Sequence, residues 1–170
     1  PEVLDKSKWF EGKHWFADKS GKYMLIYSLA VTTNIAINTD KVNPKEISSY
    51  RQLLDPKWRG QIVSQDVRKA GPGSGNIKYL YSHPDLGPDF LKKLYGEMKI
   101  TMSRDRRQMV DWLGHGRFAI YLFPTLNGVD QARSVGLPVD IVNPQQMKEG
   151  YAVTAGFNNV LLLNPGPHPN

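Results

Sequence analysis

The sequence predicts an α/β protein with a mixed, mostly parallel sheet and helices on both faces of that sheet. Short apolar runs that are typical of buried strands alternate along the chain with segments of helical periodicity. The chain has 170 residues, of which 40% are hydrophobic and 22% charged, a composition that suits a buried core. The stretch 61–76 shows one unit of this pattern: a strand, a glycine-rich loop and the start of a helix.

The first 38 residues carry two different signals. Residues 1–21 are polar with four large aromatic residues, Trp9, Phe10, Trp15 and Phe16. They predict an irregular arm with a short helix, packed either on its own domain or on a surface elsewhere. Residues 22–38 form the longest β-like segment, which is interrupted by Thr32-Thr33-Asn34. This predicts two strands joined by a bend, or one extended connection between two bodies.

A helix is predicted after residue 42. The signal is a capping residue, a proline at the first position and a glutamate three residues after the cap: Asn43, Pro44 and Glu46. An apolar stripe of Ile47, Tyr50 and Leu54 continues it, and Asp55-Pro56 predicts its end.

The remaining elements follow from periodicity and from breaking residues. We expect a strand over 61–65, a loop over 71–76, helices over 77–82 and 86–98, a strand over 99–102, a helix after a Ser103 cap, a strand over 117–123, a helix over 125–134, and strands over 139–142, 151–154 and 160–163.

Composition excludes several kinds of chemistry. There is no cysteine, so disulfides, thiolate metal sites and cysteine nucleophiles are ruled out. The four histidines lie far apart without metal-ligand spacing, and we predict neither a metal site nor a cofactor. The sequence shows no apolar run of transmembrane length and no signal-peptide pattern. The net charge is +6, but Arg104, Arg106 and Arg107 are more typical of a solvated helix face than of a nucleic-acid module.

The glycines of the 71–76 loop match none of three well-known motifs. The spacing of Gly71, Gly73 and Gly75 is neither a dinucleotide fingerprint nor a P-loop, and Pro72 excludes a nucleophile elbow at Ser74. Two interpretations remain. The loop is either a cradle of backbone N–H groups for an anion, assisted by the Ser74 hydroxyl, or a plain strand-to-helix turn with a serine cap.

Several stretches, in matching order, resemble the type II solute-binding proteins of bacterial ABC importers, in the iron(III)-like or family 1 extracellular group. The stretch Leu53-Leu54-Asp55-Pro56-Lys57-Trp58-Arg59-Gly60 is the most specific. The others are residues 35–42, 66–75, 116–120 and the closing Pro167-His168-Pro169-Asn170.

The resemblance implies a periplasmic-binding-protein-like lobe and a division of the chain. Residues 1–34 would be an arm and the first hinge strand, a remnant of the first lobe. Residues 35–155 would be the second, ligand-binding lobe. Residues 156–170 would hold the return hinge strand, with the chain stopping before the C-terminal helices of the first lobe. Exposed hinge strands would allow a homodimer of such a fragment.

The sequence departs from the family at two places. Asp66-Val67-Arg68 stands where members carry Asp-Pro-Arg. Thr125-Leu126-Asn127 stands where iron-binding members carry two adjacent tyrosines, and the chain has no Tyr-Tyr pair. The resemblance therefore favours an anionic or polar organic solute over iron.

The resemblance implies a substrate-binding component that captures a solute between two lobes and delivers it to a membrane permease. The protein would act in the periplasm or outside the cell, associated with the membrane through the permease, without catalysis and without nucleic acid. The expected ligand-binding residues are Asp66, Arg68, Gly73, Ser74, Gly75, Thr125 and Asn127. The alternatives are a transferase that uses residues 71–76 as an anion cradle, and a nucleic-acid module supported by charge alone.

Overall fold

The computed structural model describes residues 5–28, 30–68, 72–154 and 159–161. The chain forms two compact units. The larger unit is Val31–Ala152, and the smaller unit combines Pro1–Ala30 with Val153–Asn170. The predicted second lobe and the larger unit share residues 35–152, and the assignment of lobes and hinges stays a prediction.

A five-stranded sheet forms the centre of the larger unit, in the order β6-β5-β7-β4-β8. The strands are β4 (Ile35–Asn38), β5 (Ile62–Gln65), β6 (Thr101–Ser103), β7 (Ile120–Leu122) and β8 (Val139–Ile141). β5 is parallel to β6 and β7, whereas β4 is antiparallel to β7 and β8. The carboxyl ends of β5, β6 and β7 therefore share one edge of the sheet, where β4 begins.

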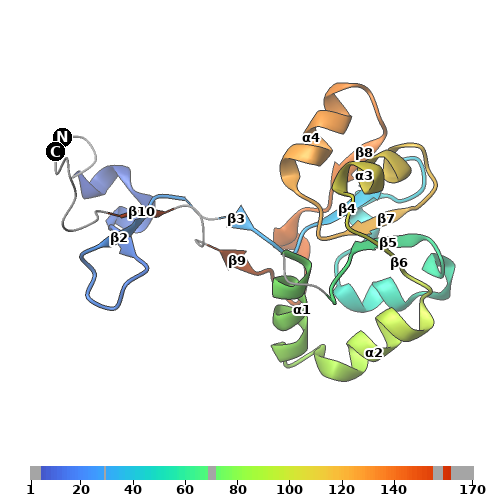
Figure 1. The fold of residues 1–170 in the computed structure, drawn as a ribbon, viewed down its shortest axis with the longest axis horizontal. Helices are drawn as coiled ribbons and strands as arrows, with labels where there is room; N and C mark the ends of the chain where they lie inside the picture. The colour runs from blue at the N-terminus through green and yellow to red at the C-terminus, as the bar shows by residue number, and fades with distance from the viewer. Residues whose placement is uncertain (1–4, 29, 69–71, 155–158, 162–170) are drawn as a thin grey trace. The chain divides into compact units, whose positions relative to one another are not determined.

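Two pairs of helices cover this sheet, one pair on each face (Figure 1). They are α1 (Pro72–Ser82) with α2 (Gly87–Glu97), and α3 (Arg106–Gly114) with α4 (Leu126–Ser134). Alternation along β4 separates the two cores, because successive strand residues point to opposite faces. Ile35 and Ile37 belong to the cluster that includes α1 and α2, and Ala36 to the cluster with α3 and α4. This arrangement confirms the predicted fold class.

The prediction of a helix after Asn43 is wrong, because this segment forms three 3₁₀ turns. They are η4 (Pro44–Glu46), η5 (Tyr50–Leu54) and η6 (Pro56–Trp58). Each turn has its own cap: the side chains of Asn43, Ser49 and Asp55 accept hydrogen bonds from the backbone two residues later. Closely spaced capping side chains compete with a continuous helix and divide the segment.

The predicted loop over 71–76 is also corrected. Gly71 lies outside the described residues, but α1 already begins at Pro72, so Gly73, Ser74 and Gly75 lie in its first turn. A proline fits this position because the first helical N–H groups have no intrahelical partner.

The cap of α3 is Asp105 rather than the predicted Ser103. Asp105 Oδ1 accepts a hydrogen bond of 3.0 Å from the N–H of Gln108. The hydroxyl oxygen of Ser103, which ends β6, accepts instead from the N–H of Asp105 at 3.1 Å. The helix thus begins two residues later than a Ser103 cap would allow.

The smaller unit contains a three-stranded sheet in the order β1-β2-β10, with β2 antiparallel to both neighbours. Its strands are β1 (Trp15–Phe16), β2 (Met24–Ile26) and β10 (Asn159–Leu161), preceded by the 3₁₀ turns η2 (Lys6–Lys8) and η3 (Phe10–Gly12). The predicted closing segment 162–170 lies outside the described residues.

The long β-like segment 22–38 divides into three strands, because β3 (Ala30–Val31) separates β2 from β4. β3 pairs with β9 (Val153–Thr154), which follows the 3₁₀ turn η7 (Pro144–Gln146). Thr32-Thr33-Asn34, the polar interruption, contains the bend between β3 and β4.

Candidate functional site

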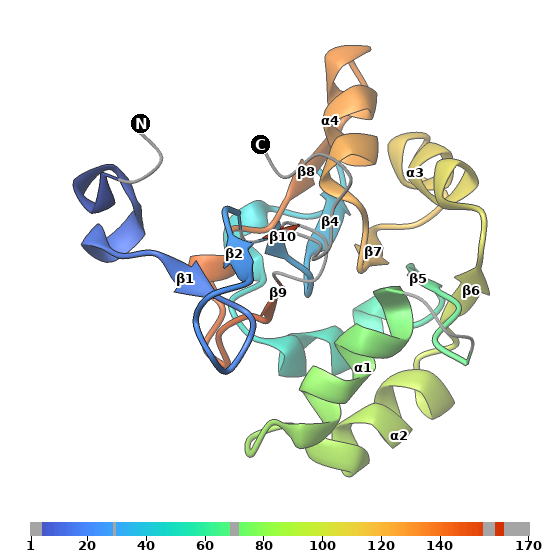
Figure 2. The ribbon, with the colours of Figure 1, turned by 60° about the vertical axis from the view of Figure 1, so that its left-hand side comes forward.

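The candidate site lies where β5, β6 and β7 end, close to the start of α1 (Figure 2). Asp66 to Arg68 follow β5, Arg104 follows β6, and Phe123 to Thr125 follow β7. Ligands of open α/β sheets bind at the carboxyl ends of parallel strands, because the connecting loops converge there.

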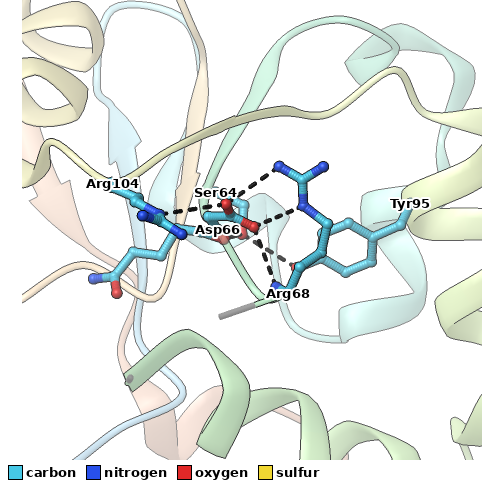
Figure 3. Close-up of polar contacts among 6 residues, drawn as sticks. Ser64, Asp66, Arg68, Tyr95 and Arg104 are labelled. Carbon is cyan, nitrogen blue, oxygen red and sulfur yellow. Dashed lines mark hydrogen bonds and ion pairs between the residues drawn. The ribbon is translucent and has the colours of Figure 1, made fainter. Parts of the chain in front are cut away.

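Asp66 is the centre of the polar contacts at this edge (Figure 3). Its Oδ1 accepts hydrogen bonds from Nε of Arg68 at 2.9 Å and from the backbone N–H of Arg68 at 3.2 Å. Its Oδ2 accepts from Nη2 of Arg68 at 3.2 Å and lies 3.6 Å from Nε of Arg104. The hydrogen bonds from Arg68, with the charges of both arginines, lower the pKa of Asp66 to about 2.

Buried Ser64 and half-buried Tyr95 support the end of β5 that leads to Asp66. The hydroxyl groups of Ser64 and Tyr95 lie 3.2 Å apart, and the Ser64 hydroxyl donates to the carbonyl of Gln65 at 3.0 Å. Burial raises the pKa of Tyr95 to about 12, so its hydroxyl stays protonated at neutral pH. These contacts fix the backbone that presents Asp66.

Gly73 allows α1 to start close to β5. A Cβ atom at this position would lie 3.3 Å from Cβ of Gln65 and 3.6 Å from the carbonyl oxygen of Asp66. By contrast, Gly75 is exposed with nothing within 4 Å of such an atom. The first turn of α1, which includes half-buried Ser74, therefore lies beside the exit of β5, and the N-terminal end of a helix favours anions.

Phe123 gives the exit of β7 an unusual backbone. Its φ is 66°, in the left-handed region, which costs a non-glycine residue about 1–2 kcal/mol. Hydrogen bonds hold it on both sides: its N–H donates to the carbonyl of Asn34 at 2.8 Å, and its carbonyl accepts from Nε2 of Gln65 at 2.8 Å. The turn leads directly to Thr125, the N-cap of α4.

Thr125 and Asn127 line a groove between α3 and α4, together with Arg106 and Arg107. Asp66, Arg68, Gly73, Ser74 and Gly75 do not line this groove. The structure therefore brings Asp66, Arg68 and Gly73 together at the exit of β5, and it places Thr125 and Asn127 at the exit of β7.

Three further residues at this edge were not singled out as site residues from the sequence. Arg104 reaches Asp66 from the end of the neighbouring strand, and its position two residues after the strand predicted over 99–102 is the signal that could have identified it. Asn34, just before β4, and Tyr121 on β7 each carry a buried side-chain oxygen without a hydrogen-bond partner in the described part of the chain. The sequence gives no signal for either of them.

Arginine side chains outnumber the carboxylate at this edge. Asp66 faces two guanidinium groups, and Arg106 and Arg107 follow on α3. Within the described residues, no group of three or more histidine, aspartate or glutamate side chains is placed to hold a metal ion. None of the described helices has the length and apolar character needed to cross a membrane.

Comparisons with known proteins agree with this architecture, although no family model matches the chain. The spermidine/putrescine-binding periplasmic protein of Escherichia coli strain K12 is 26% identical over 132 residues, which are 76% of this chain and 38% of that protein. The chain thus spans well under half the length of this relative.

Two solved structures share the fold. Iron-bound HitA from Pseudomonas aeruginosa matches with a TM-score of 0.61 and 17% identity, over 90% of this chain and 49% of HitA. The spermidine/putrescine ABC transporter substrate-binding protein PotD of Streptococcus pneumoniae matches with a TM-score of 0.54 and 19% identity, over 90% and 44%. These likenesses confirm the predicted periplasmic-binding-protein-like fold.

Proposed function

We propose that this chain is part of the substrate-binding component of a bacterial ABC import system. It captures a small solute and passes it to a membrane permease, in the periplasm or outside the cell. The observation that carries the proposal is the convergence of Asp66, Arg68 and the start of α1 at the carboxyl edge of a solute-binding-protein fold.

The proposed solute is an anionic or polar organic molecule rather than iron. The chain contains no Tyr-Tyr pair, so it lacks the two adjacent tyrosines that would bind iron. The Escherichia coli relative is named as a binder of spermidine and putrescine. In this chain, however, the Asp66 carboxylate is already paired with Arg68 and Arg104. A positively charged polyamine would meet these guanidinium groups.

Capture without chemistry fits the site better than catalysis. N–H groups at the start of α1 and the Ser74 hydroxyl would bind the solute, with Thr125 and Asn127 contributing from the exit of β7. A transferase would need a base near Ser74, and the candidate in the sequence is Asp66. Its low pKa and its hydrogen bonds with Arg68 make it a weaker base than an ordinary aspartate, which does not favour the transferase alternative.

A melting-temperature screen of the full-length protein tests this proposal. Citrate, inorganic phosphate, spermidine and iron(III) are the probes, and we expect a rise in melting temperature with an oxyanion. A ligand at about 100 times its Kd stabilises the folded state by about 2.7 kcal/mol.

A matched pair of variants locates the binding. Ser74→Ala should reduce the shift, whereas Ser134→Ala, whose hydroxyl bonds the carbonyl of Gln131 within α4, should leave it unchanged. Turnover of a probe without any shift would support an enzyme instead. Tight, steeply salt-dependent binding of random DNA would support a nucleic-acid module.

A further inference from the structure

We propose that Asp66 does not contact the solute but positions Arg68 and Arg104, and that these two arginines bind an oxyanion of the solute. The inference rests on the proposed function and assigns roles within the same site. It changes the sequence-based expectation at two residues, because Asp66 becomes a positioning residue and Arg104 becomes a ligand contact.

The exposed fractions of the three side chains carry this assignment. The Asp66 side chain is 9% exposed, whereas those of Arg68 and Arg104 are 69% and 65% exposed. A solute that approaches from solvent therefore meets the guanidinium groups before the carboxylate.

The hydrogen bonds of Arg68 and the ion pair of Arg104 with Asp66 leave both arginines able to bind a second partner. Arg68 uses Nε and Nη2 on Asp66, and Arg104 approaches it through Nε. Among the described contacts, Asp66 does not engage Nη1 of Arg68 or either Nη group of Arg104. A guanidinium has five N–H donors in a planar fork, so one edge can face Asp66 while another faces an oxyanion.

Asp66 is well placed to align these two side chains because it joins two strands. Its own N–H donates to the carbonyl of Ser103 at 3.0 Å, which ties the exit of β5 to the exit of β6. Arg68 follows the first strand and Arg104 the second. An unpaired arginine on a loop would lose side-chain entropy on binding, and the carboxylate reduces this cost by holding the guanidinium in advance.

The charge balance sets the class of ligand. One carboxylate against two guanidinium groups leaves a net positive charge, which favours carboxylate or phosphate groups and disfavours ammonium groups. Both oxyanions fit the same planar fork, so the experiment has one arm for each.

Binding constants of the full-length protein test the assignment, with citrate, inorganic phosphate and spermidine as probes in calorimetry. We expect the wild type to bind one of the oxyanions. Asp66→Asn should weaken that binding about tenfold or more, because hydrogen bonds between charged groups are lost. Arg104→Gln should weaken it to a similar degree, and Asp66→Glu should restore part of the loss.

Asp89→Asn is the matched control, since Asp89 is an exposed aspartate that pairs with Lys92 on α2. It should leave the binding constant unchanged. Circular dichroism checks that each variant folds, and if Asp66→Asn does not fold, the exposed Arg104→Gln variant still tests the oxyanion contact.

The sign of the Asp66→Asn effect separates the possible roles. Unchanged or tighter oxyanion binding would overturn the positioning role, since the carboxylate would then only repel the anion. Spermidine binding that Asp66→Asn abolishes would make Asp66 a direct ligand of a cation and overturn the inference and the proposed solute class, while the proposed role as a substrate-binding component stands. Failure of the wild type to bind citrate, inorganic phosphate or spermidine here, together with no shift by any probe in the melting-temperature screen, would contradict both.

Discussion

The carboxylate of Asp66 accepts three hydrogen bonds from Arg68 and lies 3.6 Å from Nε of Arg104. Its pKa falls from the usual value to about 2, chiefly because the guanidinium of Arg68 donates to the ionised form. In the unfolded chain this pairing is absent, and an aspartate then has a pKa of about 3.9. The folded state therefore binds its proton more weakly than the unfolded state.

We predict that Asp66→Asn changes the pH dependence of stability in a defined window. For the wild type, the contribution of Asp66 is fully present above pH 4 to 5 and is lost as the pH falls through about 2, because the unfolded chain takes up the proton first. Urea unfolding of both proteins at pH 7, 5 and 3 measures this.

The difference in the free energy of unfolding between the two proteins should be the same at pH 7 and pH 5 and smaller at pH 3. Asp85→Asn, at an exposed aspartate after α1, serves as a control for general charge effects. A difference that stays constant down to pH 3 would show that Arg68 and Arg104 do not hold the carboxylate in solution.

At the scale of single elements, two helical glycines differ in their surroundings. Gly114, the buried last residue of α3, is packed against Leu137 after α4, and an added Cβ would lie 2.7 Å from Cδ1 and 3.2 Å from Cβ of that leucine. Gly96, in α2, is exposed and has nothing within 4 Å of such an atom. The close packing of α3 against Leu137 therefore requires Gly114, whereas no neighbouring atom requires a glycine at position 96.

We predict opposite effects of the same substitution at these two positions. Gly114→Ala should lower the free energy of unfolding by about 1–3 kcal/mol, since a crowded core must shift to accept a methyl group. Gly96→Ala should raise it by about 0.5–1 kcal/mol, because alanine loses less backbone entropy in a helix than glycine. Urea denaturation measures both, and a stabilising Gly114→Ala would show that Leu137 moves away freely.

At the scale of the larger unit, four separate segments meet around Tyr50 and Glu149. The hydroxyl of Tyr50 donates to the carbonyl of Thr33 at 3.0 Å, and the backbone N–H of Tyr50 donates to Glu149 at 3.2 Å. Tyr79 on α1 donates to the carbonyl of Glu149 at 2.6 Å, and Ser49 donates to its carboxylate. The helix that starts at the candidate site is thus bonded to the residues through which the chain leaves this unit.

Three tyrosines, of which two are buried and one is half-buried, make the folded state sensitive to alkali. Burial raises the pKa values of Tyr50, Tyr95 and Tyr121 to about 12. In the unfolded chain these side chains lose their protons near pH 10, so the unfolded state gains stability above that pH. We predict that the free energy of unfolding falls between pH 10 and 12, by up to about 1.4 kcal/mol per pH unit for each tyrosine.

Thermal or urea unfolding at pH 8, 10 and 11 checks this prediction. Tyr121→Phe should make the decline with pH less steep, because it removes one titrating hydroxyl. That hydroxyl is buried and has no hydrogen-bond partner among the described residues, so its removal breaks no hydrogen bond there. Tyr23→Phe, at an exposed tyrosine of the smaller unit, should leave the slope unchanged. Equal slopes in all three proteins would contradict the assignment to buried tyrosines.

Local patterns were sufficient for the fold class and for most elements. The alternation of Ile35, Ala36 and Ile37 indicates a strand buried on both faces, and the structure assigns these residues to two cores. The segment after Asn43 was misread because Ser49 and Asp55 are caps in their own right, which a single helical stripe conceals. The start of α1 at Pro72 was missed because glycines were taken as a loop, whereas Gly73 is required for close packing on β5.

Patterns of neighbouring residues were enough to predict an α/β fold, a likeness to solute-binding proteins, and Asp66 and Arg68 as candidate site residues. Two features could be seen only in the folded structure. Arg104 forms an ion pair with Asp66, and the backbone of Phe123 is hydrogen-bonded to Asn34 and Gln65. The contact of Arg104 with Asp66 depends on the parallel register that places Gln65 beside Ser103, and the contact of Phe123 with Asn34 depends on the antiparallel register that places Ile35 beside Leu122. Both registers are set by the packing of the whole sheet.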